Sequence, residues 1–231
     1  NESKLTALKR LNCLERKLDK NASYAQSYCS KMNEYISKGY IKKLSDSELQ
    51  CSNSKLWYLP HFGVSNPNKL NKLRIVFDAA AKSKGYSLND YLLTGPDFYN
   101  MLPEILMNFR INRIAFIGDI KEMFLQILVR NEDKPAQRFL WRNMRRDIEP
   151  ETYEIQVVFF GATCSPSIAQ AVLTKNATEH SDSYPKACYE IKNNHYMDDY
   201  LGGADSLDEA IKLVNDIITV HKCGGFEICN W

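Results

Sequence analysis

The sequence lacks the features that mark membrane-spanning and secreted proteins. No apolar run approaches the roughly 20 residues that a helix needs to cross a bilayer. The first ten residues, NESKLTALKR, are polar and mixed in charge, which differs from a secretory signal. We therefore expect no membrane partner for this chain.

Paired cysteines are also missing. The seven cysteines are an odd number, and none forms a C-x-x-C motif. His221, Cys223 and Cys229 are close in sequence, but their spacing matches no zinc-binding pattern. We expect free, mostly buried thiols and a reducing, intracellular setting.

Neither sign of charge is in large excess, but the charged residues are unevenly distributed along the chain. The net charge is only +2, yet residues 1–75 hold 14 Lys or Arg against 6 Asp or Glu, and the remainder hold 16 against 22. A basic first third suggests contact with a polyanion, and an acidic remainder could bind cations. Ordinary charged helix surfaces would explain the same numbers.

Apolar residues make up 44% of the 231, enough for a packed core in one large domain or two small ones. Helical and strand-like periodicities alternate along the chain, and several hairpins look antiparallel, which predicts an α+β fold. Ser165 is predicted to cap a helix that has Pro166 in its first turn, and Ser206 opens a capping box with Glu209. We predict helices at 3–20, 24–38, 97–112, 165–179 and 206–221, and strands or extended segments at 55–64, 73–78, 114–117, 137–142, 153–160 and 194–203.

Three aspartates stand at the ends of apolar β segments. Asp119 follows AFIG, and Asp198 and Asp199 interrupt the hairpin NHYMDDYLGG. If the two segments are neighbours in one sheet, the carboxylates converge, which is unfavourable without a cation. Carboxylate oxygens suit Mg²⁺, and two such ions can clamp a phosphoryl transfer. The alternative is that Asp198 and Asp199 simply form a β-turn, for which Asp is a favoured residue.

A set of motifs, in a fixed order, decides between these interpretations. Together they resemble the reverse transcriptases of retrotransposons, and specifically the Bel/Pao group. The resemblance covers nearly the whole chain from about residue 25. The motifs are YLPHFGVSNPNKL (58–70), LRIVFDAAAKSKGYSLNDYLLTGPDF (73–98), GDIKEMFLQI (118–127), QRFLWR (137–142), FFGATCSPSIAQ (159–170), YMDDYL (196–201) and GGFEICNW (224–231).

The resemblance implies the fingers and palm of a right-hand polymerase, in which an antiparallel palm sheet packs on helices. The whole of 1–231 would be a single reverse transcriptase domain fragment. Residues 1–95 and about 130–155 would be fingers, and about 96–129 and 156–231 palm. The thumb is expected to be absent, as is a basic residue that would follow the last palm turn. The chain has no initiator Met, so we interpret it as an excerpt of a longer polyprotein.

The resemblance also assigns the metal ligands. Asp119, Asp198 and Asp199 would be the catalytic, metal-binding carboxylates, and the backbone carbonyl of Ile120 a further ligand. The cofactor would be two Mg²⁺ ions, with Mn²⁺ as the alternative.

The nucleotide site would draw on both parts of the hand. Arg74 would lie against the triphosphate, helped by Lys72 or Lys69 at the fingers tip. Asp78 would brace Arg74 or a nearby backbone amide. The ring of Phe124 would exclude a 2′-hydroxyl, so that deoxynucleotides are selected. The incoming nucleotide would also contact Phe160, which replaces a retroviral Gln, and Gly161.

Template and primer would contact a third group of residues. These are Ser165, Pro166 and Gln170 at the start of the helix after Gly161, and Tyr196 and Met197 in the hairpin.

The function implied is RNA-directed DNA polymerisation, in which dNTPs are added to a primer 3′-hydroxyl on an RNA or DNA template. Protease, ribonuclease H and integrase domains would be partners in the parent polyprotein. The implied location is a cytoplasmic retroelement particle, with the nucleus as the alternative. A catalytically inert or domesticated fragment that only binds nucleic acid is the second hypothesis. A carboxylate–metal nuclease is a third, but it leaves Arg74 and Phe124 unexplained.

Overall fold

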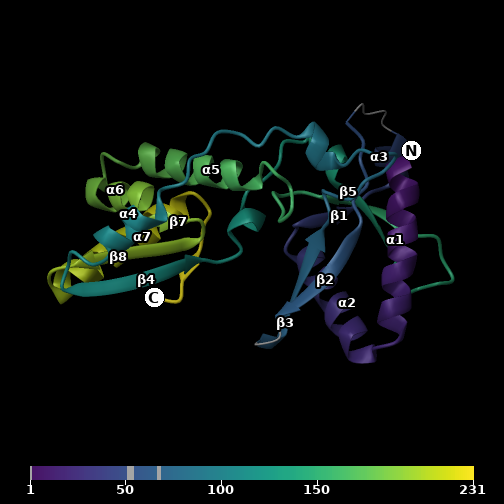
Figure 1. The fold of residues 1–231 in the computed structure, drawn as a ribbon, viewed down its shortest axis with the longest axis horizontal. Coiled ribbons are helices and arrows are strands. Elements are labelled where there is room, and N and C mark those ends of the chain that lie inside the picture. The colour runs from purple at the N-terminus through teal and green to yellow at the C-terminus, as the bar shows by residue number, and fades with distance from the viewer. Residues whose placement is uncertain (1, 51–54, 67–68) are drawn as a thin grey trace. The chain divides into compact units, whose positions relative to one another are not determined.

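A computed structural model describes residues 2–50, 55–66 and 69–231, with the side chains of 66 and 69–72 excepted. The chain divides into two compact units, each described by itself below (Figure 1). The first comprises Asn1–Leu93 and Leu128–Thr163, and the second comprises Thr94–Ile127 and Cys164–Trp231. No helix within the described ranges is long and apolar enough to cross a membrane.

The first unit packs two long helices against two small antiparallel sheets. One sheet has the strand order β1-β6-β5 and the other pairs β2 with β3. Its helices are α1 (Glu2–Asp19), α2 (Ala22–Ser37) and α3 (Asp46–Gln50), with 3₁₀ turns η1 (Leu88–Tyr91) and η3 (Lys134–Gln137). Its strands are β1 (Ile41–Lys43), β2 (His61–Asn66), β3 (Lys69–Phe77), β5 (Arg138–Trp141) and β6 (Glu151–Ile155).

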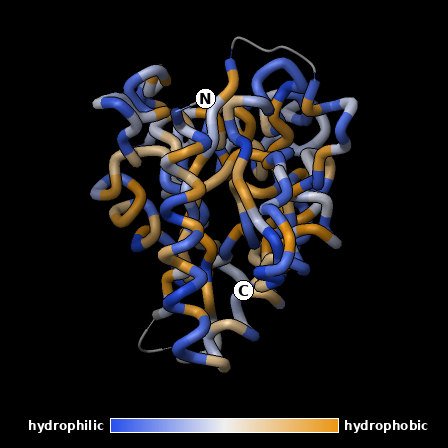
Figure 2. The backbone as a smooth tube through the Cα atoms, turned by 90° about the vertical axis from the view of Figure 1, so that its right-hand side faces the viewer, coloured by the Kyte–Doolittle hydropathy of each residue, from blue (hydrophilic) through white to orange (hydrophobic). Residues whose placement is uncertain are grey.

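Helical periodicity explains how α1 joins the core. Leu11, Leu14 and Leu18 recur three or four residues apart and are buried, while Arg16 and Lys17 between them are exposed. Figure 2 shows apolar and polar residues alternating along the helices of this unit. Glu15 lies on the buried side too, where Arg142 and Arg146 donate to its carboxylate at 2.7 and 2.9 Å. The pairing offsets the cost of burying that charge.

Aromatic rings fill the centre of the first unit. His61 lies among Tyr28, Phe77, Phe139 and Trp141, with ring centroids 5.3–6.0 Å away. The Tyr28 hydroxyl donates to His61 Nδ1 at 2.5 Å, and His61 Nε2 donates to the Leu140 carbonyl at 2.9 Å. Burial lowers the pKa of His61 to about 4, so this imidazole is neutral at pH 7.

The second unit is a four-stranded antiparallel sheet, ordered β7-β8-β4-β9, that packs on helices. Its strands are β4 (Ile114–Ile120), β7 (His195–Tyr196), β8 (Asp199–Ala204) and β9 (Ile228–Cys229). Its helices are α4 (Leu102–Asn108), α5 (Ser165–Glu179), α6 (Pro185–Asn193) and α7 (Leu207–Cys223), with the 3₁₀ turn η2 (Met123–Gln126). Helices and antiparallel strands in both units confirm the α+β prediction.

Two predicted helices need correction, and one helix was not predicted. Residues 97–101 are not helical: Asp97 accepts a bond from the Tyr99 amide, and α4 starts only beside Pro103. The α5 helix begins at Ser165, so Ser165 is its first residue and Cys164 is the cap, without a side-chain capping bond. Helix α6 was not predicted, although Pro185 at its first position is a typical start signal.

The prediction of mostly buried thiols is wrong for the described cysteines. Six of them are free, but only Cys188 is buried, while Cys13 and Cys223 are exposed. Cys51 lies outside the described residues.

Candidate active site

Strands β4 and β8 place two of the predicted carboxylates directly opposite each other. Asp119 pairs with Asp199 in the antiparallel register, two positions beyond the pair of Ile117 with Leu201. Directly opposite residues point to the same face of a sheet. Ile117 on that face is 55% exposed, whereas Tyr200, on the opposite face, is fully buried. The aspartates therefore lie on the open face of the sheet.

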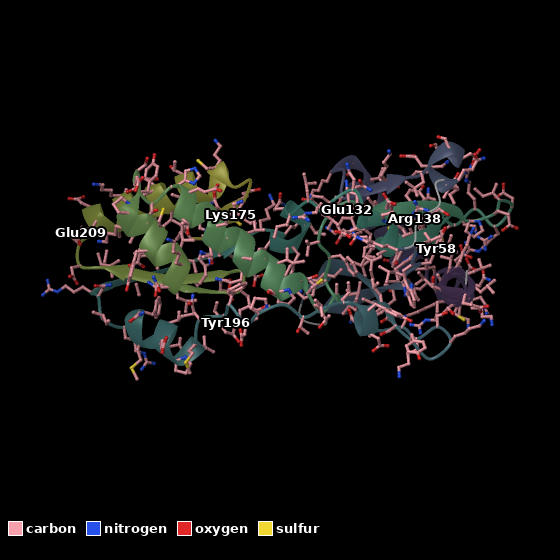
Figure 3. The ribbon with its side chains drawn as sticks, turned by 90° about the horizontal axis from the view of Figure 1, so that it is seen from above. Tyr58, Glu132, Arg138, Lys175, Tyr196 and Glu209 are labelled. Carbon is pink, nitrogen blue, oxygen red and sulfur yellow. The ribbon has the colours of Figure 1, made fainter. Side chains whose placement is uncertain are left out.

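The third carboxylate belongs to the tight turn between β7 and β8. Tyr196 pairs with Asp199, so only Met197 and Asp198 connect the strands (Figure 3 labels Tyr196). The Ile120 amide donates to the Asp198 carbonyl at 2.8 Å, which fastens the turn to the end of β4. Met197 adopts φ +58°, a conformation that costs energy for a non-glycine residue. The two segments are therefore neighbours in one sheet, which is the condition under which the carboxylates were expected to converge.

The electrostatics at this edge reflect the crowding of negative charge. Partial burial raises the pKa of Asp199, and the nearby charges of Asp198 and Asp119 raise it further. The pKa of the Cys229 thiol, opposite Asp119, is raised by burial and then by the charges of Asp119 and Glu227. Neighbouring carboxylates thus add to the effect of burial in both shifts, and a cation at this edge would oppose their contribution.

The chemistry of these ligands fits a hard divalent cation, because all three side chains offer carboxylate oxygens. Their placement is not a finished coordination shell. Across residues 2–50, 55–66 and 69–231, no group of three or more His, Cys, Asp or Glu side chains could hold a metal ion as placed. His221 does not belong to such a group either: it is buried, and its Nδ1 is bonded to the Ile217 carbonyl. A cation would have to draw the aspartate side chains together.

A small hollow beside the turn brings four predicted site residues together. Phe124 from η2, Pro166 and Gln170 from α5, and Met197 from the turn all line it, and Tyr99 completes the polar part of the rim. Phe124 and Gln170 are only 9% and 3% exposed, so each presents little more than one edge to the hollow. The structure thus places an aromatic ring next to the aspartate turn.

Other predicted residues belong to the first unit. Arg74 is exposed on β3, opposite Val64. The side chains of Lys69 and Lys72, predicted at the fingers tip, lie outside the described residues. Asp78 accepts from the Ala80 amide at 3.2 Å and pairs with Arg10 at 3.5 Å, which confirms the backbone-amide alternative for Asp78.

Phe160 and Gly161 form an exposed loop in the first unit. Phe160 is 56% exposed. Gly161 has φ +114°, and a Cβ there would stand 2.8 Å from the Phe77 carbonyl oxygen, so the position requires glycine. Asn89, which lies in the 73–98 motif but was assigned no role there, holds the loop. Its side-chain nitrogen donates to the Gly161 carbonyl and its side-chain oxygen accepts from the Thr163 amide, both at 3.0 Å.

A fourth acid, Glu190 on α6, supports the aspartate hairpin from its buried side. One carboxylate oxygen accepts from the Tyr200 hydroxyl at 3.0 Å and from the Asn194 side chain at 2.5 Å. Tyr200 directly follows Asp199, and Asn194 directly precedes β7. Glu190 therefore ties both arms of the hairpin to one helix. No motif spacing pointed to it, because α6 itself was not predicted.

Two buried histidines also lie behind the hairpin. The rings of His195 and His221 are 5.1 Å apart, and burial lowers the pKa of both. Both rings are therefore neutral at pH 7, and neither adds positive charge near the aspartates.

Comparisons with known proteins agree with this geometry. The family model described as "Reverse transcriptase (RNA-dependent DNA polymerase)" matches residues 70–229. The chain is 28% identical over 110 residues to the Gag-Pol polyprotein of Rous sarcoma virus subgroup C (strain Prague). It is 27% identical over 110 residues to that of avian leukosis virus subgroup A (isolate RSA). Each match covers 48% of this chain and 7% of the viral polyprotein, so the chain corresponds to a small part of these relatives.

Proposed function

Because the chain belongs to the reverse transcriptase family, we propose that it is the core of an RNA-directed DNA polymerase. The opposition of Asp119 and Asp199, with Asp198 in the adjoining turn, is the observation that carries the proposal. In this proposal residues 1–95 and about 130–155 are the fingers, and about 96–129 and 156–231 are the palm. The two compact units divide the chain at nearby positions, except that 156–163 belong to the first unit. The motif set further supports assignment to the Bel/Pao group.

The reaction proposed is attack of a primer 3′-hydroxyl on the α-phosphate of a dNTP, with loss of pyrophosphate. Asp119, Asp198 and Asp199, with the Ile120 carbonyl, would hold two Mg²⁺ or Mn²⁺ ions. When bound, these ions supply electrostatic stabilisation of the charge that develops on the phosphate oxygens. The aspartates themselves would orient the reacting groups, since Asp119 and Asp199 are on paired strands and the turn that carries Asp198 is hydrogen-bonded to the end of β4.

The sugar of the incoming nucleotide would lie beside the turn, next to the small hollow that Phe124 lines. Phe124 would close one wall and make a 2′-hydroxyl clash, and Met197 and Tyr196 would adjoin the primer end. Pro166, Ser165 and Gln170 on α5 would support the template. From the first unit, Arg74 would bind the triphosphate with Lys72, while Phe160 and Gly161 would approach the nucleotide.

The proposal also covers the setting of the chain. The template would be RNA or DNA, bound mainly through its phosphates. Protease, ribonuclease H and integrase domains would accompany this chain in a parent polyprotein. The polymerase would act in a cytoplasmic particle, with the nucleus as the second compartment.

Primer extension tests the proposal directly. The chain is supplied with oligo(dT) annealed to poly(rA), dTTP and Mg²⁺, and extension is followed on a denaturing gel. We expect Asp198→Asn to abolish extension and Asp205→Asn, an exposed aspartate just beyond β8, to leave it intact. Extension that survives Asp198→Asn would reject the active-site assignment.

The second candidate is an inert fragment that binds nucleic acid without polymerising. The charge of the first 75 residues, 14 Lys or Arg against 6 Asp or Glu, is the observation behind it, because a basic surface binds a polyanion with or without catalysis. Binding of primer–template without incorporation, in both Mg²⁺ and Mn²⁺, would select this candidate.

A further inference from the structure

Three aromatic side chains form a row on the surface of the first unit. The ring of Tyr91 lies 5.8 Å from Tyr86 and 5.9 Å from Trp57, between centroids. Tyr86 and Tyr91 are 59% and 64% exposed, and Trp57 is partly exposed. We call Trp57, Tyr86 and Tyr91 the aromatic row. Exposed rings in contact with each other, outside the core, offer faces on which flat ligands can stack.

The backbone holds these rings in place. Tyr86 closes the short turn Ser83–Tyr86, which Gly85 permits with φ +89°. Tyr91 ends η1, and Asp90 accepts from the Ser87 amide and hydroxyl at the start of that turn. The Trp57 carbonyl accepts from the Arg138 amide, beside the bridge of Tyr58 with Arg138 (both labelled in Figure 3). Rings on such anchored segments lose little freedom when a ligand binds.

Two exposed lysines adjoin the row. Lys82 precedes the turn that carries Tyr86, and Lys84 lies within that turn, where it pairs with Glu2 at 2.8 Å. The hydrogen bond from Lys84 lowers the pKa of Glu2, and the charge of Lys9 lowers it further. Hydrogen bonds from Ser87 lower the pKa of Asp90, and the charge of Lys82 adds to the effect. Both lysine side chains are exposed beside the rings, where they can contact the phosphates of a strand that stacks there.

We propose that the aromatic row is a stacking site for single-stranded nucleic acid, with bases on the rings of Tyr86 and Tyr91 and phosphates at Lys82 and Lys84. The proposal extends the proposed function, since it names a place where an unpaired template strand is held. Stacking on aromatic rings tolerates any base, and lysines beside the rings follow the backbone. Trp57 would support Tyr91 from the side and report binding by its fluorescence.

Binding of labelled oligonucleotides to the 231-residue chain tests this. The probes are 12-nucleotide dT and rU strands, measured by fluorescence anisotropy over a salt series. We expect Tyr86→Leu and Tyr91→Leu each to weaken binding by about 5- to 150-fold, the range for removing one base stack. Both probes should lose affinity, because stacking does not depend on the sugar. The matched control is Tyr189→Leu, since Tyr189 on α6 is also 64% exposed.

The salt series separates rings from lysines. The tyrosine variants should keep the wild-type slope of affinity against salt concentration. Lys82→Gln should reduce that slope by about 0.7, because one phosphate of the strand is no longer neutralised. Tyrosine variants that bind both strands like Tyr189→Leu would overturn the proposal. So would a dimer that depends on these tyrosines in sedimentation while oligonucleotide binding stays unchanged.

The two proposals fail in different ways. If the chain binds single strands through the aromatic row but Asp198→Asn does not affect extension, the active-site assignment is wrong and the stacking site stands. If extension depends on Asp198 and the tyrosine variants bind normally, the stacking site is wrong and the polymerase assignment stands.

Discussion

Asp199→Asn should make the chain more stable without metal and less responsive to metal. Asp119 and Asp199 are directly opposite on neighbouring strands, and the charges of Asp119 and Asp198 contribute to the raised pKa of Asp199. Replacing one carboxylate by a neutral amide removes this repulsion while keeping the size and shape of the side chain. The same change removes a proposed metal ligand.

The expected magnitudes are small but opposite in sign. Like charges directly opposite on two strands cost roughly 0.2–1 kcal/mol. For a chain of this length, 1 kcal/mol corresponds to roughly 2–4 °C in Tm. Divalent ion at ten times its Kd would stabilise the wild type by about 1.4 kcal/mol. The variant should therefore unfold up to about 4 °C above the wild type in EDTA and fall below it when the cation is saturating.

Thermal unfolding followed by circular dichroism, in EDTA and then across a Mg²⁺ or Mn²⁺ series, measures both effects. Asp205→Asn is the control, because it removes an exposed aspartate near β8 and should change neither midpoint nor metal response. The reasoning is refuted if Asp199→Asn is less stable than the wild type in EDTA. It is refuted equally if the variant gains as much from the cation as the wild type does.

Three further predictions concern pH, the hairpin support and substrate choice. Because burial lowers the pKa of His61 to about 4, the stability that comes from its neutral form is complete above pH 6.5. As pH falls toward 4, the free energy of unfolding should decrease by roughly 3 kcal/mol. Urea unfolding at pH 7.5 and 4.5 should show this loss, and the loss should be smaller in His61→Gln. Glu190→Ala leaves Tyr200 and Asn194 without their acceptor and should lower the free energy of urea unfolding by about 1–3 kcal/mol. Glu190→Gln keeps an acceptor oxygen and should recover most of that loss. Equal losses in the two variants would exclude the hydrogen-bond explanation. Phe124→Val should raise ribonucleotide incorporation relative to deoxynucleotide in primer extension, and an unchanged ratio would remove Phe124 from sugar selection.

Helices and strands could be predicted where the sequence pattern that specifies them lies within a few consecutive residues. The capping box at Ser206 and Glu209 predicted the start of α7, and the Ser206 side chain does accept from the Glu209 amide. The strand before Asp119 followed from its apolar run. The strand predicted over 153–160 is wrong for residues 156–160, although their apolar content is typical of a strand. Strand β6 ends at Ile155, and among 156–160 only Val157 forms a bridge, with Leu128. Apolar burial there comes from tertiary packing, which periodicity does not report.

The residues of the candidate site also divide into those that the sequence predicts and those that it does not. The three aspartates could be found because each follows or interrupts an apolar β segment, and the motif order supplied their pairing. The supporting residues could not. Glu190 meets Asn194 at the helical i,i+4 spacing, which could not be used because α6 was not predicted. The other partners, Tyr200 for Glu190 and Gly161 and Thr163 for Asn89, lie 10–74 residues away, and no spacing rule connects those positions. The direct opposition of Asp119 and Asp199 likewise depends on the register of β4 with β8, which only the fold determines.

Like charges and backbone strain in the second unit meet at one edge of its sheet. Repelling carboxylates stand there, and the two segments that carry them each contain a residue with a left-handed backbone, Met197 at φ +58° and Glu122 at φ +52°. The opposite face of the same strands holds favourable contacts, with Tyr200 buried and bonded to Glu190. A hairpin stabilised from its buried face can keep charge and backbone strain on its open face, where a bound cation and its substrate would relieve the charge. This division explains why Asp199→Asn is expected to stabilise the chain and Glu190→Ala to destabilise it. Both acids affect the same hairpin, but Asp199 is on its open face and Glu190 binds its buried face.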